Sequence, residues 1–186
     1  LEDAGGMLAF NAGLARAERT DQGFHLEVGG PEPMQLACAI LVNSAGLDAP
    51  NLARRIAGYD PSHAPDAHYC KGNYYTLKGK SPFSRLIYPV PEAAGLGVHV
   101  TIDLGGQCRF GPDVEWVTGI DYDVDPKRAD VFYDAVRRYW PRLADGALGP
   151  GYSGIRPKLA PAGLPNADFV VQGPAIHGVP GLLHLF

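Results

Sequence analysis

Arg156 is the residue whose type and setting best suit the binding of an acid. It lies in Gly154-Ile155-Arg156-Pro157, and a residue that precedes proline is disfavoured in a helix, so we expect Arg156 in an extended strand. A guanidinium offers paired N–H donors that match the two oxygens of a carboxylate. An arginine on a rigid strand can therefore orient an acid substrate, and a structural ion pair is the alternative interpretation.

His99 is the residue best placed to accept a proton. It lies within Val98-His99-Val100-Thr101, a β-branched stretch that is typical of a strand. A neutral imidazole can take up a proton near pH 7, so His99 is a candidate general base. The alternative is a buried histidine that a neighbouring strand satisfies.

A second group of polar residues lies on one predicted strand, His68 to Leu77. Lys71 and Tyr75 are spaced by an even number of residues, as are Tyr69 and Asn73, so all of these share one face of the strand. A lysine among tyrosines on one face indicates a polar pocket for an anion, such as the second carboxylate of a diacid. The alternative is an exposed face along which the lysine stem lies. Lys71 and Tyr75 are therefore candidate substrate-binding residues.

The run from Ala39 to Gly46 predicts a buried strand that ends in a turn. Its apolar residues, Ala39 to Val42, indicate a strand that is buried on both faces. Gly46 permits a tight backbone path, and Asp48 and Pro50 suit the start of a helix. Free backbone N–H groups at such a helix start can hold a phosphate. The alternative is an ordinary core strand followed by a helix.

The composition excludes several classes of protein. The chain has 186 residues, of which 46% are hydrophobic, and a formal net charge of −4, which argues against a nucleic-acid partner. Its three cysteines are far apart, so we expect free thiols, and we assign no metal site. No signal peptide and no membrane-spanning apolar run is seen. We expect a cytoplasmic protein, with peripheral membrane association as the alternative.

The periodic segments predict a mixed α+β fold that contains an antiparallel sheet. We expect strands at Met7–Phe10, Leu14–Glu18, Phe24–Val28, Gln35–Val42, His68–Leu77, Arg85–Pro89, Gly97–Asp103, Gln107–Phe110, Asp168–Gln172 and Gly181–Phe186. Asp125 and Pro126 open a helix whose apolar stripe is Val131, Phe132, Ala135, Val136 and Tyr139. The letters of Gly149 to Gly154 match a dinucleotide fingerprint, but we read them as a loop entering a strand because no helix follows.

Several segments resemble one known family. Val42 to Ala49, with its Asn43-Ser44-Ala45-Gly46, resembles the Asn-Ala-Ala-Gly turn of the D-amino-acid-oxidase superfamily of FAD-dependent oxidoreductases. Across the chain, an ordered set of segments resembles the L-2-hydroxyglutarate dehydrogenase/oxidase branch. These segments are Cys70–Tyr75, Leu86–Pro91, Leu96–Thr101, Phe110–Asp113 and Gly154–Pro157.

The resemblance implies FAD as the cofactor and a division of the chain. Residues 1–58 would be part of a Rossmann-like FAD-binding domain, 59–150 the substrate domain and 151–186 strands returning toward the FAD domain. The implied cofactor-binding residues are Leu14, Asn43, Ser44, Ala45 and Gly46. The resemblance also implies that the chain is an internal fragment with an incomplete FAD site, the Gly-rich FAD-binding unit lying upstream.

The resemblance further implies the reaction. The arginine of the matching Gly-Leu-Arg-Pro motif binds the substrate α-carboxylate, a role that falls to Arg156 here, with His99 as the proton acceptor. We expect hydride transfer to flavin from a small 2-hydroxy acid such as L-2-hydroxyglutarate. An amino-acid oxidase and a non-catalytic ligand-binding fragment are the alternatives. Exposed sheet edges of a fragment also suggest self-association.

Overall fold

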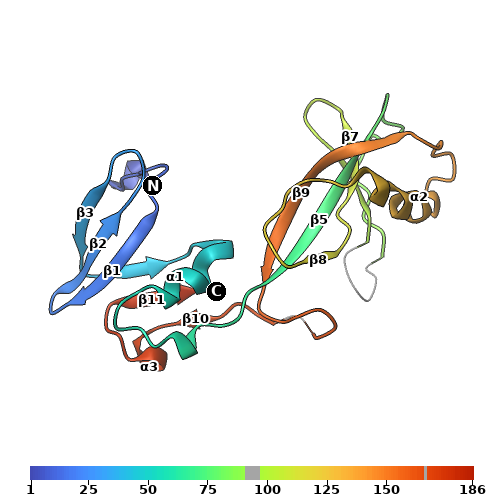
Figure 1. Cartoon of the computed structure of the whole chain (residues 1–186). Coiled ribbons are helices and arrows are strands. Elements are labelled where there is room, and N and C mark those ends of the chain that lie inside the picture. The colour runs from blue at the N-terminus through green and yellow to red at the C-terminus, as the bar shows by residue number, and fades with distance from the viewer. Residues whose placement is uncertain (91–96, 166) are drawn as a thin grey trace. The chain divides into compact units, whose positions relative to one another are not determined.

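The computed structural model describes residues 1–90, 97–165 and 167–186. The chain forms two compact units, Leu1–Ala67 with Asn166–Phe186, and His68–Pro165 (Figure 1). We call them unit 1 and unit 2. Unit 1 is built from two separate stretches of chain, because a strand near the C-terminus pairs with one from the first fifty residues.

The first sheet of unit 1 is an antiparallel meander. It contains β1 (Leu14–Thr20), β2 (Gly23–Val28) and β3 (Met34–Cys38), with β2 in the middle. Phe24 and Leu26 alternate along β2 and are buried, as the alternating pattern of this segment predicts. They belong to a core that also contains Ile56 and Tyr59. The sheet is thus anchored to the rest of unit 1 by one face.

The second sheet of unit 1 contains the predicted strand–turn–helix. Its strands are β10 (Val171–Gln172), β11 (Leu182–Leu185) and β4 (Leu41–Asn43), and β11 pairs with β4 in parallel and with β10 in antiparallel. After β4 come the 3₁₀ turn η2 (Gly46–Asp48) and helix α1 (Ala49–Arg54). The remaining short helices are η1 (Glu2–Ala4), η3 (Pro61–His63) and α3 (Pro174–His177). The order of elements in this part is therefore as predicted.

Two predictions about unit 1 are wrong. Met7–Phe10 is not a strand, and its two end residues are 94% and 83% exposed, so no sheet covers them. The strand expected at Gln35–Val42 is split between β3 and β4, which lie in different sheets. Ile40 and Val42 are 68% and 48% exposed rather than buried on both faces, because β4 pairs with β11 alone among the described residues.

The sheet of unit 2 is organised around one long strand, β5 (His68–Leu77) (Figure 1). Its neighbours are β6 (His99–Ile102), β7 (Cys108–Gly111), β8 (Glu115–Val117) and β9 (Leu148–Lys158). β7 and β8 pair with successive parts of one edge of β5, and β9 pairs along the other edge. All pairs are antiparallel, as predicted.

The unit 2 sheet has two different faces. Residues paired across strands share a face, and the partners Tyr75, Phe110 and Val100 are all fully buried. Helix α2 (Ala129–Arg137) packs on them, with the ring of Phe132 centred 4.5 Å from that of Tyr75. We call this side the core face and the opposite side the open face.

The helix on the core face begins where the sequence predicts. The Asp125 carboxylate accepts a hydrogen bond of 2.9 Å from the Lys127 N–H, and the 3₁₀ turn η4 (Pro126–Arg128) leads into α2. Phe132 and Val136 are fully buried. Val131, however, is 60% exposed, so its place in the apolar stripe is wrong. One residue before Phe132 lies a quarter turn away from the buried side of the helix.

Tertiary pairing changes three other elements of unit 2. Arg85–Pro89 forms only an isolated bridge between Ile87 and Val100, and β8 was not predicted. Gly149–Gly154 lies inside β9 rather than in a loop, because inter-strand hydrogen bonds to β5 override the weak strand preference of glycine. A strand in this position agrees with the rejection of the dinucleotide fingerprint, which requires a helix after its glycines.

The predicted fold class is confirmed, since the chain is mixed α/β with antiparallel sheets and few helices. No helix in the described ranges is long and apolar enough to cross a membrane. The boundaries 1–58, 59–150 and 151–186 stay a prediction. The two compact units change instead near residues 67 and 165, because β9 pairs with β5 over nearly its whole length.

Phe132→Ala is expected to lower the free energy of unfolding of unit 2 by about 3–5 kcal/mol, because it empties a fully buried aromatic site. The matched control Val131→Ala, one residue away and 60% exposed, is expected to change it by less than about 0.5 kcal/mol. Urea denaturation followed by tryptophan fluorescence measures both, since Trp140 lies against Phe83 and Phe110. Equal losses from the two variants would contradict the assigned core.

Candidate functional site

A cavity of about 330 Å³ in unit 1 contains most of the predicted cofactor-binding residues. Its walls are formed by Leu14, Leu26, Val28, Leu41, Val42, Asn43, Ser44, Ala45, Leu52 and Ile56. Leu14 comes from β1, whereas Asn43, Ser44 and Ala45 come from the end of β4 and the turn after it. Gly46 is not part of the wall, and it begins η2 with a positive φ of 57° that favours glycine.

Asn43 fixes the turn that lines this cavity. Its side chain is 2% exposed, and Nδ2 donates to the Ala49 carbonyl at 2.8 Å and to His184 Nδ1 at 3.0 Å. Its Oδ1 accepts a hydrogen bond of 3.2 Å from the Ala45 N–H. These bonds tie the turn both to the start of α1 and to β11, so the backbone beside the cavity is held in one conformation.

His184 supports Asn43 from the neighbouring strand. It is fully buried, and burial, followed by the charge of His177, lowers its pKa to about 4. The imidazole is therefore neutral near pH 7, with Nδ1 available as the acceptor for Asn43. Tyr59 packs edge-on against its ring, with the two centroids 4.6 Å apart.

The open face of the unit 2 sheet carries both predicted catalytic residues. Arg156 on β9 is the register partner of Cys70, which lies on the face opposite to Tyr75. His99 on β6 is paired with Gly111, the residue after core-face Phe110. Arg156 and His99 therefore share the open face, as the proposed chemistry requires.

Aromatic residues lie on the open face between Arg156 and His99. Tyr74 on β5 is stacked on Tyr152 of β9, with the ring centroids 4.6 Å apart and the planes 12° from parallel. The ring of Tyr88 is centred 4.3 Å from that of His99. Burial and the neighbouring Tyr152 raise the pKa of Tyr74, while the positive charge of Arg156 opposes this shift.

The separation of Arg156 and His99 is large for a small ligand. The strands β7 and β5 lie between β6 and β9. With strands about 4.8 Å apart and a rise of about 3.3 Å per residue, the two Cα atoms are about 20 Å apart. One small acid can contact both groups only when the two side chains extend toward each other past Tyr74.

Arg156 differs from three arginines of its unit, Arg109, Arg128 and Arg137, in having no acidic partner among the described residues. Arg109, also on the open face, is paired with Asp103 at 2.7 Å, and Arg128 binds Asp113 at 2.6 Å. Among the described residues, no hydrogen bond or ion pair involves the Arg156 guanidinium, and its side chain is exposed. Its donors are thus available for an anionic ligand, which the structural ion-pair interpretation does not provide.

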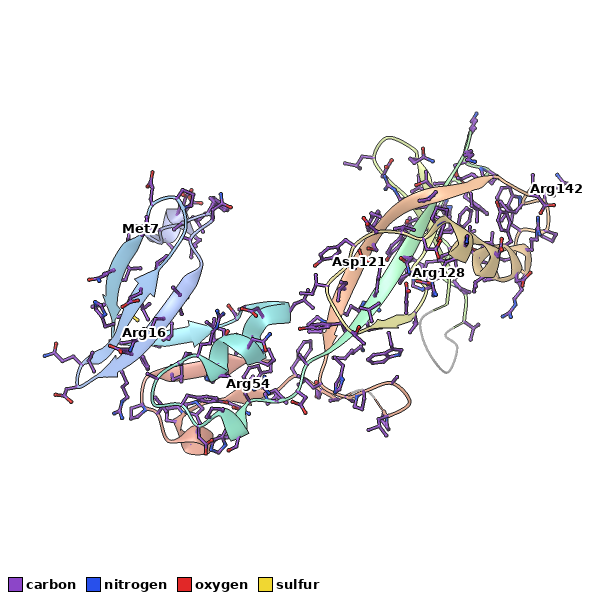
Figure 2. All side chains as sticks on the ribbon, in the orientation of Figure 1. Met7, Arg16, Arg54, Asp121, Arg128 and Arg142 are labelled. Carbon is purple, nitrogen blue, oxygen red and sulfur yellow. The ribbon has the colours of Figure 1, made fainter. Side chains whose placement is uncertain are left out.

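Lys71 and Tyr75 do not join this face. Lys71 is 4% exposed, and its Nζ donates to the Asp123 carbonyl and lies 3.5 Å from the carboxylate of Asp121, which is labelled in Figure 2. The Tyr75 hydroxyl donates to the Asp125 carbonyl, and burial raises its pKa to about 12. Both side chains therefore hold the segment before α2 against the core face, and we leave them out of the proposed substrate site.

The whole chain matches one protein family. The sequence model described as DAO, FAD dependent oxidoreductase, covers residues 1–186. The chain belongs to this family of FAD-dependent oxidoreductases. The DAO-family chain is 50% identical over 165 residues to the mitochondrial L-2-hydroxyglutarate dehydrogenase of Arabidopsis thaliana. The match covers 82% of this chain and 34% of the relative, so the chain spans about a third of the length of the curated relative it matches.

Solved structures of similar fold include oxidases, one of them with FAD bound. Glycine oxidase from Geobacillus kaustophilus superposes with a TM-score of 0.68 at 20% identity, over 99% of this chain and 44% of that one. L-α-glycerophosphate oxidase from Mycoplasma pneumoniae with FAD bound gives a TM-score of 0.67 at 17% identity, over 92% and 44% of the two chains. At these identities the likeness concerns the fold, and the predictions of family and of FAD as cofactor are confirmed.

The cavity in unit 1 fits part of FAD. Seven of the residues that line it are leucines, valines or an isoleucine, whose aliphatic side chains suit a flat ring system, and Asn43 and Ser44 add polar groups from the turn. Leu14, Asn43, Ser44 and Ala45 line this cavity together, and their role in binding the cofactor stays a prediction. When bound, FAD accepts a hydride and so supplies the oxidising chemistry.

Sequence reasoning missed residues that only strand pairing brings together. Leu26 and Ile56 line the cavity, yet their spacing indicates nothing more than core positions. On the open face, Tyr74 and Tyr152 are far apart in sequence, and their stacking follows from the register of β5 and β9. The period of two along β5 could have separated Tyr74 from Tyr75, but it could not say which face carries Arg156.

The buried neutral state of His184 makes unit 1 sensitive to acid. Because its pKa in the folded chain is about 4, below the ordinary value, its stabilising effect is complete above about pH 6.5. The effect is lost as the pH falls toward 4, by up to roughly 3 kcal/mol. His184→Gln keeps an acceptor for Asn43 and is expected to reduce this pH dependence.

Urea denaturation curves at pH 7 and pH 4.5, followed by circular dichroism, measure the effect. The control His25→Gln, in the half-buried strand β2, is expected to keep the pH dependence of the parent chain. If His184→Gln lost as much stability between these pH values as the parent, the buried imidazole would not be the titrating group.

Proposed function

We propose that this chain is part of an FAD-dependent enzyme that oxidises a small 2-hydroxy acid of the L-2-hydroxyglutarate type to the 2-oxo acid. The observation that carries the proposal is an arginine on the open face, Arg156, whose guanidinium has no acidic partner among the described residues. The 50% identity to an L-2-hydroxyglutarate dehydrogenase supports the choice of substrate class.

Arg156 is proposed to bind the substrate carboxylate. Its two terminal nitrogens can donate to both carboxylate oxygens, and strand β9 fixes the backbone from which the side chain extends. A carboxylate held by paired donors places the neighbouring carbinol carbon in a defined position, which reduces the entropic cost of the reaction. FAD, when bound, would supply the acceptor for the hydride of that carbon.

His99 is proposed to take the proton of the substrate hydroxyl. The oxygen–hydrogen electron pair stays on oxygen and forms the carbonyl as the hydride departs, so the substrate loses one proton and one hydride. His99 is 8% exposed, and Tyr88 packs on its ring, which shields the imidazole from bulk water. The proton therefore leaves the substrate for a group that is held in place.

We also propose that an unpaired strand edge in unit 1 supports self-association of the chain. Strand β4 has one free edge among the described strands, and Ile40 and Val42 beside it are exposed. Such an edge presents unpaired N–H and C=O groups that a second copy can meet. Light scattering across a range of chain concentrations tests this, and a monomer at all concentrations would count against it.

Arg156→Ala in the full-length protein is expected to lower kcat/KM for L-2-hydroxyglutarate at least about 100-fold, because a charge-assisted carboxylate contact is lost. The kcat/KM of Arg156→Lys is expected to lie between those of the parent and of Arg156→Ala, since lysine keeps the charge but loses the paired donors. The control Arg142→Ala, in the loop after α2 (Figure 2), is expected to stay within twofold of the parent.

The same assay separates the two substrate classes. Turnover of 2-hydroxy acids and of the matching 2-amino acids is followed by bleaching of the flavin absorbance. Reduction of the flavin by an amino acid alone would replace the proposed substrate class. Unchanged kinetics in Arg156→Ala would remove the arginine from the site.

His99→Gln is expected to lower kcat at least about 100-fold while KM stays within about threefold, because a proton acceptor acts mainly in the transition state. Thermal unfolding of the variant checks that the nearly buried position still folds. A kcat within threefold of the parent, in a folded variant, would assign the proton to another group.

A further inference from the structure

Tyr74 lies in the same row of the unit 2 sheet as His99. In the antiparallel pairing of β5 with β7, Tyr75 is opposite Phe110, so Tyr74 falls opposite Gly111. Gly111 is in turn the register partner of His99 on β6. Only one strand therefore separates Tyr74 from His99 in this row, which places their Cα atoms about 10 Å apart.

The ring of Tyr74 lies over Gly111. A Cβ atom built at Gly111 would lie 2.6 Å from Cδ1 and 2.9 Å from Cγ of Tyr74, and 2.6 Å from the Asn73 carbonyl oxygen. Contacts this short leave no room for a side chain, so glycine is the residue that lets the ring cover β7. The ring therefore extends over the open face toward the strand that carries His99.

The hydroxyl of Tyr74 lies near groups from both halves of the proposed site. Burial, followed by the neighbouring Tyr152, raises the pKa of Tyr74; the charge of Arg156 opposes this shift, and that of Tyr88 adds to it. The ring of Tyr88 is itself centred 4.3 Å from that of His99. Tyr74 thus links the surroundings of Arg156 with those of His99.

This hydroxyl has no structural use in the fold. It makes no hydrogen bond with the residues that the structure describes, although the side chain is half-buried. By contrast, the hydroxyls of four other tyrosines take part in hydrogen bonds within the chain: Tyr59, Tyr75, Tyr133 and Tyr139. Because its pKa is raised, the Tyr74 hydroxyl stays protonated near pH 7 and is available as a donor.

The other tyrosine of the stack is held by packing. The Tyr152 ring is stacked on that of Tyr74, and the guanidinium of Arg109 lies over it, 5.8 Å from its centroid. Asp103 pairs with Arg109 at 2.7 Å and so neutralises its charge. Tyr152 therefore fixes the position of the Tyr74 ring, and we assign it no contact with a ligand.

We propose that the Tyr74 hydroxyl donates a hydrogen bond to the C2 oxygen of the substrate, which is the oxygen whose proton passes to His99. The C2 O–H bond breaks, its proton goes to the imidazole, and its electron pair becomes the second bond of the carbonyl. The hydride of C2 goes to the acceptor that FAD would supply. Negative charge grows on the oxygen during this step, and a donor held beside it stabilises that charge.

This inference rests on the proposed function, since it takes Arg156 as the carboxylate contact and His99 as the proton acceptor. Tyr74→Phe tests it, because the variant keeps the stacked ring and removes only the hydroxyl. Tyr152→Phe is the matched control, which removes the hydroxyl of the other ring in the same stack. Thermal unfolding checks that both variants fold as the parent does.

The kinetics of the full-length holoenzyme with L-2-hydroxyglutarate give the first readout. Tyr74→Phe is expected to lower kcat about 100-fold while KM stays within about threefold, because the hydrogen bond strengthens as charge grows in the transition state. Tyr152→Phe is expected to stay within about twofold of the parent in both constants.

Ligand binding gives a second readout that does not depend on turnover. Isothermal titration calorimetry compares 2-oxoglutarate, which carries an oxygen on C2, with glutarate, which does not. Tyr74→Phe is expected to weaken 2-oxoglutarate about fivefold and glutarate by less than about twofold, because only the first ligand loses a hydrogen bond. An equal loss for both ligands would place the hydroxyl on a carboxylate and overturn its assignment to the C2 oxygen.

The outcomes separate this inference from the proposed function. If Tyr74→Phe kept the parent kcat and bound both ligands normally while Arg156→Ala and His99→Gln lost activity, Tyr74 would have no part in the reaction, but the proposed function would stand. If Arg156→Ala bound glutarate normally, the proposed function and this inference would both fall. Equal losses in Tyr74→Phe and Tyr152→Phe would mean that the stack, rather than the Tyr74 hydroxyl, supports activity.

Discussion

The antiparallel pairing of β5 with β9 is the interaction on which the site in unit 2 depends. It runs from His68 opposite Lys158 to Leu77 opposite Leu148, with one irregularity between Asn73 and Tyr75. Because paired residues share a face, this register alone decides that Arg156 lies with Cys70 and Tyr74 and not with Tyr75. A slip by one residue would turn the guanidinium toward the core face, where a buried unpaired charge is costly.

The core face of that sheet packs against the helix, whereas the open face leaves polar groups available for a ligand. On the core face, ring packing of Tyr75 against Phe132 and the polar contacts of Lys71 attach α2 and the segment before it. These contacts use up the hydrogen-bonding groups of the residues that make them. On the open face, the Arg156 guanidinium keeps its donors available, so binding is possible where structural bonding has not already occurred.

In unit 1, side-chain hydrogen bonds hold the turn after β4 beside the cavity. Asn43 meets backbone groups of the turn and of α1, and His184 on β11 accepts its remaining donor. Since β11 comes from the far end of the chain, the cavity wall depends on a contact between residues 141 positions apart. Closing such a long loop has an entropic cost, which the buried core around Phe24 and Leu182 helps to offset.

The sequence by itself predicted the family and the cofactor through its resemblance to known flavoproteins. It predicted most of the elements through local patterns: the turn up to Gly46, the alternation in β2 and the Asp125 cap of the helix. It also predicted that Arg156 lies in an extended strand, since a residue before proline is disfavoured in a helix. Only the tertiary structure decided that Arg156 and His99 share a face while Lys71 and Tyr75 lie on the other. Faces, edges and the break at Ile40 depend on which distant strands pair, and no local pattern records that choice.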